Sequence, residues 1–333
     1  MWTGTELIAW GGVARTGTVR PVSDGAAYNP ATRTWRTIAP APRGVLGVVG
    51  NGAAWTGKAA VFWAGNSPDG PATGAVYDPA TDSWRRLPAG PLGPREGYSS
   101  VWTGKELLLI SGTSGDGLAT PSAAAVIPAT GSWRLLPALN ALTGLLANGA
   151  VWDGQEAFVI GRQSLCPQLG SSCTKFRPIF VAYDPATDTA RPINVRSAPV
   201  GAKQLEQLSP IAWTGSEVVF ATIGNPAAGL VGYSPDTGAW SVGRAAPCAV
   251  AAGYTQTAWL GDRYVAPCGT NGLQIYDPAT NTWEKITPGP SPLNSREGSA
   301  IVWTGTDLIA WSGTVRKPGN PTPADGASLT LKR

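Results

Sequence analysis

Two Arg-Glu pairs recur at the same point of a repeated sequence pattern and are the clearest candidates for ligand binding. Arg95-Glu96 and Arg296-Glu297 each precede a short segment of small residues that ends in tryptophan. The planar guanidinium of arginine can hold a carboxylate, a sulfate or an acidic sugar through two parallel hydrogen bonds. The candidate ligand-binding residues at these and related positions are Arg43, Arg95, Glu96, Glu206, Arg296 and Glu297. The same charges would also serve as solvated or paired residues that line a narrow channel.

The two glutamates raise the question of catalysis. Glycoside hydrolysis uses two carboxylates on either side of one ligand, and Glu96 and Glu297 could approach each other if their loops meet. Histidine is absent from all 333 residues, which excludes a Ser-His-Asp triad, a Cys-His dyad, the usual zinc sites and His-ligated copper or haem. We therefore expect no catalytic residues, no cofactor and no metal.

The composition is that of a globular protein without a strongly charged surface. The 25 Lys and Arg residues exceed the 21 Asp and Glu residues by four and form no cluster, which argues against nucleic acid and anionic membranes as partners. Hydrophobic residues make up 43% and charged residues only 14%, so a large core is expected. No run approaches the roughly 18 apolar residues that a membrane-spanning helix needs.

A tryptophan-turn motif repeats along the whole chain. The motif Trp-Thr-Gly, or a close variant, begins at Trp2, Trp55, Trp102, Trp152, Trp213, Trp259 and Trp303. A second motif, Tyr-Asp-Pro-Ala-Thr-x-x-Trp or a variant of it, follows the first six, at residues 28–35, 77–84, 126–133, 183–190, 233–240 and 276–283. A period of about 47 residues fits the four-stranded blade of a β-propeller.

Each repeat predicts four short antiparallel strands, which we term a to d. The first tryptophan ends strand a, and a Thr-Gly turn leads into an apolar strand b such as 106–110, which we expect to be buried on both faces. Strand c ends in tyrosine and turns through Asp-Pro-Ala-Thr into strand d, which opens with tryptophan. The recurring tryptophans are expected to pack in the core rather than to bind ligand. The pattern predicts an all-β fold without a helix longer than about two turns.

The combined pattern resembles the kelch repeat of the β-propellers related to the non-catalytic frame of galactose oxidase. It consists of Gly11-Gly12 after strand b, then Tyr-Asp-Pro-x-Thr-x-x-Trp, then a linker rich in Pro and Arg, and it spans residues 2–331. The fourth unit departs from it at Ala190 and the third at Ile127, and only the first unit keeps the Gly-Gly pair. The resemblance implies ligand binding around the mouth of a central channel, by the loops that join strands d to a and b to c. The copper-radical chemistry of the superfamily needs histidine and does not carry over.

Seven tryptophan anchors predict a kelch-type β-propeller of seven blades in a single domain over residues 1–333. The expected blade units are about 1–41, 42–92, 93–139, 140–197, 198–245, 246–290 and 291–333. Strand a of the first blade and strand d of the last are missing from the pattern, so both blades are expected to be incomplete. A single upstream segment would supply both strands. The alternative is a six-bladed ring closed by the strand at 296–303.

Four cysteines favour two local disulfides. Cys166 and Cys173 are seven residues apart, whereas Cys248 and Cys268 flank one hairpin-like segment. A zinc site would need histidine or CxxC spacing, which this chain lacks, and four reduced, buried thiols are the other interpretation. Disulfides persist in oxidising compartments, so we expect an extracellular or cell-surface protein whose signal peptide has been lost upstream of Met1.

These observations predict a non-catalytic binding or interaction propeller, exported and monomeric, with an unknown protein or glycan as its partner. The alternative is a carbohydrate-active enzyme of kelch type, similar to a sialic-acid epimerase or a lyase, that uses the Arg and Glu residues at the channel mouth. Two or more carboxylates and a tyrosine that converge in a deep pocket would favour the enzyme.

Overall fold

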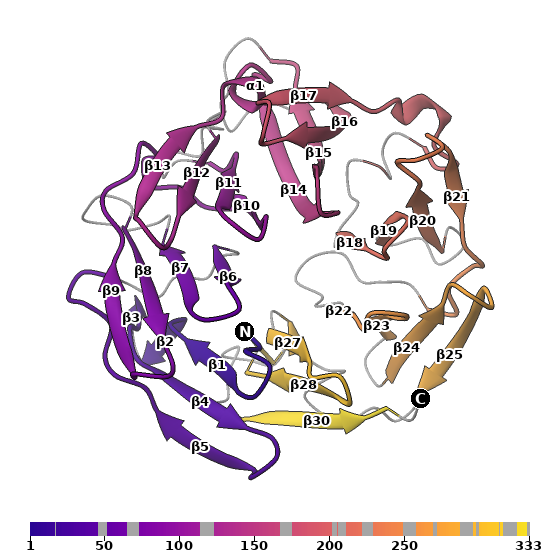
Figure 1. Cartoon of the computed structure of the whole chain (residues 1–333). Coiled ribbons are helices and arrows are strands. Elements are labelled where there is room, and N and C mark those ends of the chain that lie inside the picture. Colours follow the sequence, from indigo (N-terminus) through magenta and orange to yellow (C-terminus); the bar gives the residue numbers. More distant parts are fainter. Residues whose placement is uncertain are drawn as a thin grey trace. The chain divides into compact units, whose positions relative to one another are not determined.

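The computed structural model is built almost entirely of β-strands (Figure 1). It describes residues 1–16, 18–45, 52–64, 73–113, 123–166, 175–201, 205, 211–221, 229–248, 258–268, 272–286, 296–297, 300–312, 314–315 and 325–331. The helix α1 (Pro137–Asn140) has four residues and a 3-10 helix at Val195–Ser197 has three, so the expectation of short helices is confirmed for the described residues. None of the helices in this part of the chain is long and apolar enough to span a membrane.

The chain divides into two compact units, Met1–Ile193 and Asn194–Arg333. In the first unit, the strands form four antiparallel blades: β1 (Leu7–Trp10), β4 (Gly25–Asn29) and β5 (Thr34–Thr37); β6 (Ala53–Trp55), β7 (Ala60–Ala64), β8 (Thr73–Asp78) and β9 (Ser83–Arg86); β10 (Ser99–Trp102), β11 (Leu107–Ile110), β12 (Ala123–Ile127) and β13 (Ser132–Leu135); β14 (Leu145–Trp152), β15 (Ala157–Ser164), β16 (Phe176–Asp184) and β17 (Thr189–Pro192).

The second unit holds three further blades. Their strands are β18 (Ile211–Trp213), β19 (Val218–Ala221), β20 (Leu230–Tyr233) and β21 (Trp240–Val242); β22 (Ala258–Trp259), β23 (Tyr264–Cys268), β24 (Gly272–Asp277) and β25 (Thr282–Ile286); β27 (Ala300–Trp303), β28 (Asp307–Trp311) and β30 (Gly326–Thr330). Two small two-stranded sheets accompany the blades: the hairpin of β2 (Val13–Thr16) and β3 (Thr18–Pro21), and the pair of β26 (Arg296–Glu297) and β29 (Thr314–Val315), which are not consecutive in the chain.

The prediction of seven propeller blades with incomplete first and last members is confirmed. Blade one begins with strand b (β1). On its strand-a side, Met1 and Ile8 exchange two backbone hydrogen bonds of 2.8 Å, and Trp2 bridges to Leu7. Blade seven contains strands a, b and c (β27, β28 and β30). The six-bladed alternative is wrong, because β27, β28 and β30 form a sheet of their own rather than completing another blade.

The a–b turns follow one local design. In blade three, the Thr103 hydroxyl accepts a hydrogen bond from the Glu106 amide at 3.1 Å and donates one to the Glu106 carbonyl at 3.1 Å. The glycine after it needs a positive φ, which only glycine adopts without strain. This φ lies between 87° and 113° in all seven turns, at Gly4, Gly57, Gly104, Gly154, Gly215, Gly261 and Gly305.

Strand b forms the buried centre of a blade. All four residues of β11 (Leu107–Ile110) are fully buried although their side chains point alternately to the two faces. Neighbouring blades therefore cover both faces of the strand, as its continuous apolar sequence predicts. Strand d forms the outer edge, where residues such as Leu135 are half exposed.

The strand-d tryptophans are less deeply buried than the sequence indicates, because they bind the linker of the preceding blade. The Trp84 indole donates a hydrogen bond to the Ala39 carbonyl at 2.7 Å, while the Ala39 amide donates to the Asp82 carboxylate at 2.9 Å. We call this pair of hydrogen bonds the tryptophan clamp. The second unit repeats it, because the Trp283 indole donates to the Arg244 carbonyl and the Arg244 amide donates to the Asn281 side chain. Trp63 on strand b is buried, but Trp35 is 40% exposed, so the tryptophans are not uniformly core residues.

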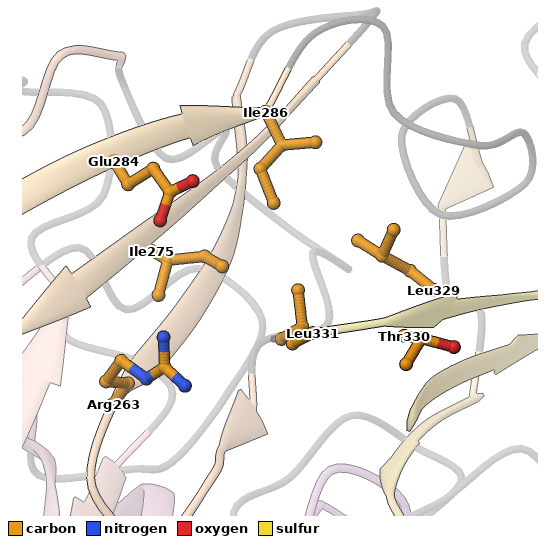
Figure 2. A pocket seen from close by; sticks show the side chains of 7 residues that line it. All are labelled: Arg263, Ile275, Glu284, Ile286, Leu329, Thr330 and Leu331. Atoms are coloured by element: carbon orange, nitrogen blue, oxygen red, sulfur yellow. The ribbon is translucent and has the colours of Figure 1, made fainter. Parts of the chain in front are cut away.

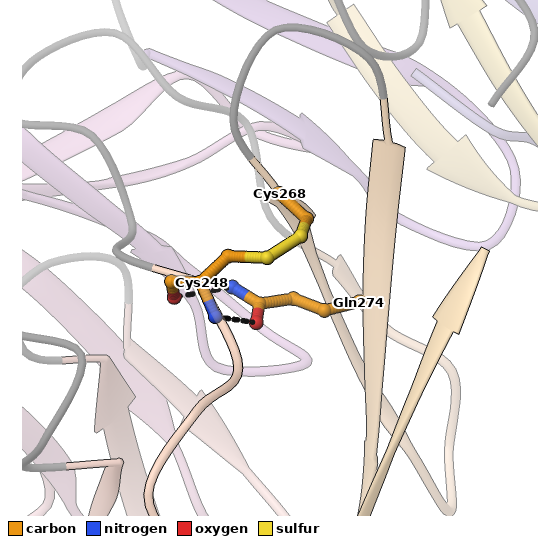
Figure 3. Close-up of a disulfide and its surroundings, with 3 residues drawn as sticks. All are labelled: Cys248, Cys268 and Gln274. Atoms are coloured by element: carbon orange, nitrogen blue, oxygen red, sulfur yellow. Dashed lines mark hydrogen bonds between the residues drawn. A yellow bond between two sulfur atoms is a disulfide. The ribbon is translucent and has the colours of Figure 1, made fainter. Parts of the chain in front are cut away.

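A disulfide joins the start of blade six to the end of its strand b (Figure 3). The Cα atoms of Cys248 and Cys268 lie 5.1 Å apart, which confirms the predicted bond. The side-chain amide of the fully buried Gln274 accepts a hydrogen bond from the Cys248 backbone amide at 3.2 Å and donates one to the Cys248 carbonyl at 3.0 Å. The other predicted pair, Cys166 with Cys173, includes a residue, Cys173, that lies outside the described residues.

Candidate functional site

One predicted ligand-binding pair lies on the d–a linker of blade three. The Arg95 guanidinium is buried and donates to the Gly93 and Ser111 carbonyls, both at 3.1 Å. Burial lowers the pKa of Arg95 from its ordinary value. The backbone of Glu96 pairs with Thr113 through two hydrogen bonds of 2.8 Å, and Glu96 itself is exposed. Arg95 thus fixes this linker to the end of strand b, and Glu96 faces solvent.

The remaining predicted residues are distributed over both units. Arg43 is exposed, and its carbonyl accepts a hydrogen bond from Arg86. Arg296 and Glu297 form β26 and pair with Val315 and Thr314, which repeats the backbone pairing of Glu96. Glu206 lies outside the described residues. The two Arg-Glu pairs lie in different compact units, and their meeting on one ligand stays a prediction.

The opposite edge of the blades, where the a–b and c–d turns lie, carries a set of ion pairs that the sequence did not reveal as pairs. In three blades a glutamate four residues after the strand-a tryptophan meets an arginine on strand d. Arg36 lies 2.7 Å from Glu6, and Arg191 lies 2.9 Å from Glu156. The third pair joins Glu106 to Arg134. The recurrence of these glutamates four residues after the strand-a tryptophan was the signal in the sequence. That spacing does not show which residue each glutamate contacts.

Blade two keeps the arginine of this pattern but lacks the glutamate. The position equivalent to Glu6 and Glu106 is Ala59, and the position equivalent to Arg36 and Arg134 is Arg85. Arg85 donates instead to the Pro128 carbonyl of blade three. Among the described residues, Arg85 forms no ion pair with a carboxylate.

A cavity of about 620 Å³ opens where this carboxylate is missing, between blades two and three. We call it the inter-blade cavity. The side chains that give it its chemical character are Lys58, Asp78, Arg85, Trp102 and Lys105. Three of these are cationic and one is anionic, so the lining has a positive excess. An indole and three cations around one concave space are suited to an anionic ligand with an apolar face.

A second cavity, of about 350 Å³, lies beside the last strand of blade seven (Figure 2). Ile275 and Ile286 of blade six and Leu329 and Leu331 of blade seven form its apolar part. Ile275 and Ile286 stand at the positions that Val76 and Leu87 occupy in blade two, where Trp133 of the next blade packs against their cluster. The cavity therefore corresponds to the place of a strand-d tryptophan in a complete blade.

The comparisons with known proteins give no family. No family model matches the chain, and a search of curated proteins finds no match. The assignment of function therefore depends on the blades, the loops and the inter-blade cavity.

Proposed function

We propose that this chain is an exported, non-catalytic binding propeller of the kelch type. It recognises a glycan or a protein through the loops at one edge of its blades, where strands b lead to c and strands d lead to the next a. The residues that we expect to contribute at this loop edge are Arg43, Arg95, Glu96, Glu206, Arg296 and Glu297.

The observation that supports the proposal is the contrast between the two edges of the blades. At the a–b edge, one turn design recurs in all seven blades. At the loop edge, blade one carries an additional hairpin, β2–β3, and strands β15 and β16 of blade four extend to eight and nine residues. A constant frame that presents variable loops is the usual arrangement of a binding protein.

The disulfide supports the exported location. A bond between Cys248 and Cys268 persists where the surroundings are oxidising, as in secreted and cell-surface proteins. Its place beside the linker that enters blade six also stabilises one of the segments at the loop edge.

A glycan array and a peptide-display screen of the oxidised protein test this function. We expect a hit whose binding falls at least tenfold, about 1.4 kcal/mol, in Arg43→Ala or Glu96→Ala. Gln155→Ala is the matched control, because Gln155 is exposed on the a–b turn of blade four, at the opposite edge.

Equal loss of binding in the loop variants and in Gln155→Ala would contradict recognition at the loop edge. Turnover of an array glycan by the wild-type protein would contradict the non-catalytic assignment and support a carbohydrate-active enzyme. Loss of that turnover in Glu96→Gln would then assign the activity to the loop edge.

A further inference from the structure

We propose that the inter-blade cavity binds a carboxylate-bearing sugar of the hexuronate type, whose carboxylate takes the place of the glutamate that blade two lacks. This site lies at the a–b and c–d edge of blades two and three, apart from the loop edge of the proposed function. The proposal concerns only residues of the first compact unit.

The first argument comes from the other blades, which show how this position is normally filled. Arg36 binds Glu6 through Nε at 3.0 Å and Nη2 at 2.7 Å, one nitrogen to each carboxylate oxygen. Such a two-point contact is the strongest geometry that an arginine offers to a carboxylate. Arg85 occupies the same strand-d position, with Ala59 in place of the glutamate, and donates to the Pro128 carbonyl. A carboxylate for this arginine can therefore come from a ligand.

The second argument is the charge of the lining. Lys58 and Lys105 lie on the a–b turns of blades two and three, and both line the cavity with Arg85. Asp78 is the one carboxylate there, and its Oδ1 already accepts the Ala80 amide at 3.0 Å in the c–d turn. A concave surface with three cations attracts an anion more strongly than an exposed flat surface does.

The third argument is the indole of Trp102, which distinguishes a sugar acid from a simple anion. Trp102 lines the cavity and packs against the apolar cluster that blades two and three share. The Trp84 indole lies on the other face of blade two, where it binds the Ala39 carbonyl and packs against Trp10 and Tyr77. A rigid indole can cover the C–H face of a sugar ring while the ring's hydroxyls bind Lys and Asp side chains. The volume of about 620 Å³ lies within the usual range for small-molecule sites.

Blade four provides an internal contrast that supports this interpretation. There Glu156 is present, and its carboxylate lies 2.9 Å from the Arg191 guanidinium. In blade four the strand-d arginine therefore has its carboxylate within the blade, as in blades one and three, whereas Ala59 leaves that position of blade two to a ligand.

The test uses glucuronate and galacturonate, with glucose and galactose as neutral controls and acetate as a carboxylate without a sugar. Binding to the full chain is measured by titration calorimetry, and the indole N–H signal of Trp102 is followed by NMR, with that of Trp84 on the other face of blade two as the internal control. We expect a uronate to bind at least tenfold more tightly than its neutral counterpart and than acetate, and to shift the Trp102 signal but not the Trp84 signal.

Two substitutions at Ala59 separate charge from volume. Ala59→Glu restores the glutamate of the sibling blades and should pair with Arg85, so uronate affinity should fall at least tenfold while the thermal midpoint is unchanged or higher. Ala59→Gln fills the same space without the charge and should bind better than Ala59→Glu. Arg85→Met should also lose at least tenfold in affinity.

Undiminished uronate binding in both Ala59→Glu and Arg85→Met would overturn the proposal. Equal affinity for galactose and galacturonate, or for acetate and galacturonate, would overturn it as well. Because these variants lie at the edge opposite to Arg43 and Glu96, failure here leaves the loop-edge function to be judged by its own variants.

Discussion

Removal of Arg134 tests how much the buried ion pairs stabilise the blades. Its guanidinium binds Glu106 with Nε at 3.1 Å from Oε2 and with Nη2 on Oε1, and it also donates to the Pro185 carbonyl of blade four at 3.1 Å. The Glu106 side chain is only 10% exposed. In the variant Arg134→Met, this carboxylate therefore loses its counter-charge in a place that water scarcely reaches.

The size of the effect follows from these exposures. Breaking a fully buried pair by removing one partner costs about 3–5 kcal/mol, but the Arg134 side chain is 37% exposed, which reduces the cost. We expect a loss of about 2–3 kcal/mol in the free energy of unfolding. Arg191→Met is the matched control, because Arg191 is 53% exposed and Glu156 is 21% exposed. An exposed pair of this kind contributes only about 0.2–1 kcal/mol.

Urea unfolding followed by tryptophan fluorescence measures both variants, and both pairs lie in the first compact unit. The midpoint should fall clearly more for Arg134→Met than for Arg191→Met, with the same dependence on urea. The double variant Glu106→Met/Arg134→Met should recover more than half of the loss, since it removes the unpaired carboxylate. Equal losses in the two single variants, or no recovery in the double variant, would refute the reasoning.

Three further predictions concern other contacts. The double variant Cys248→Ser/Cys268→Ser should lower the free energy of unfolding by about 3 kcal/mol, because the disulfide closes a loop with a sequence separation of 20. An unchanged urea midpoint would contradict this. Hydrogen bonds from the Tyr77 hydroxyl and the Ala39 amide lower the pKa of the Asp82 carboxyl in the folded state. The ionised Asp82 therefore stabilises the fold above its unfolded-state pKa, and this stabilisation is lost as the pH falls through the lowered folded-state value. The variant Asp82→Asn should show a weaker decrease of the thermal midpoint on the acid side. A peptide of residues 128–137, which contains strand d of blade three, should raise the thermal midpoint by filling the cavity beside β30, whereas the same peptide with Trp133→Ala should not.

The sequence alone was sufficient for the blades and their turns, because each is encoded locally. Every Thr-Gly turn depends on residues within four positions, as Thr103, Gly104 and Glu106 show, and the burial of β11 follows from its own apolar sequence. The Cys248–Cys268 bond was also accessible, since both residues flank one hairpin. Repetition of these local signals seven times gave the blade number and the two incomplete blades.

The tertiary structure alone decided which side chains meet across strands and between blades. Glu106 and Arg134 are 28 residues apart in the sequence and meet only when strands b and d are placed in register. The hydrogen bond from the Trp84 indole to the Ala39 carbonyl likewise joins two different blades. In sequence, Ala59 is an ordinary small residue. Only the packing places it beside the cavity that Arg85 also lines, and among the described residues no carboxylate pairs with Arg85.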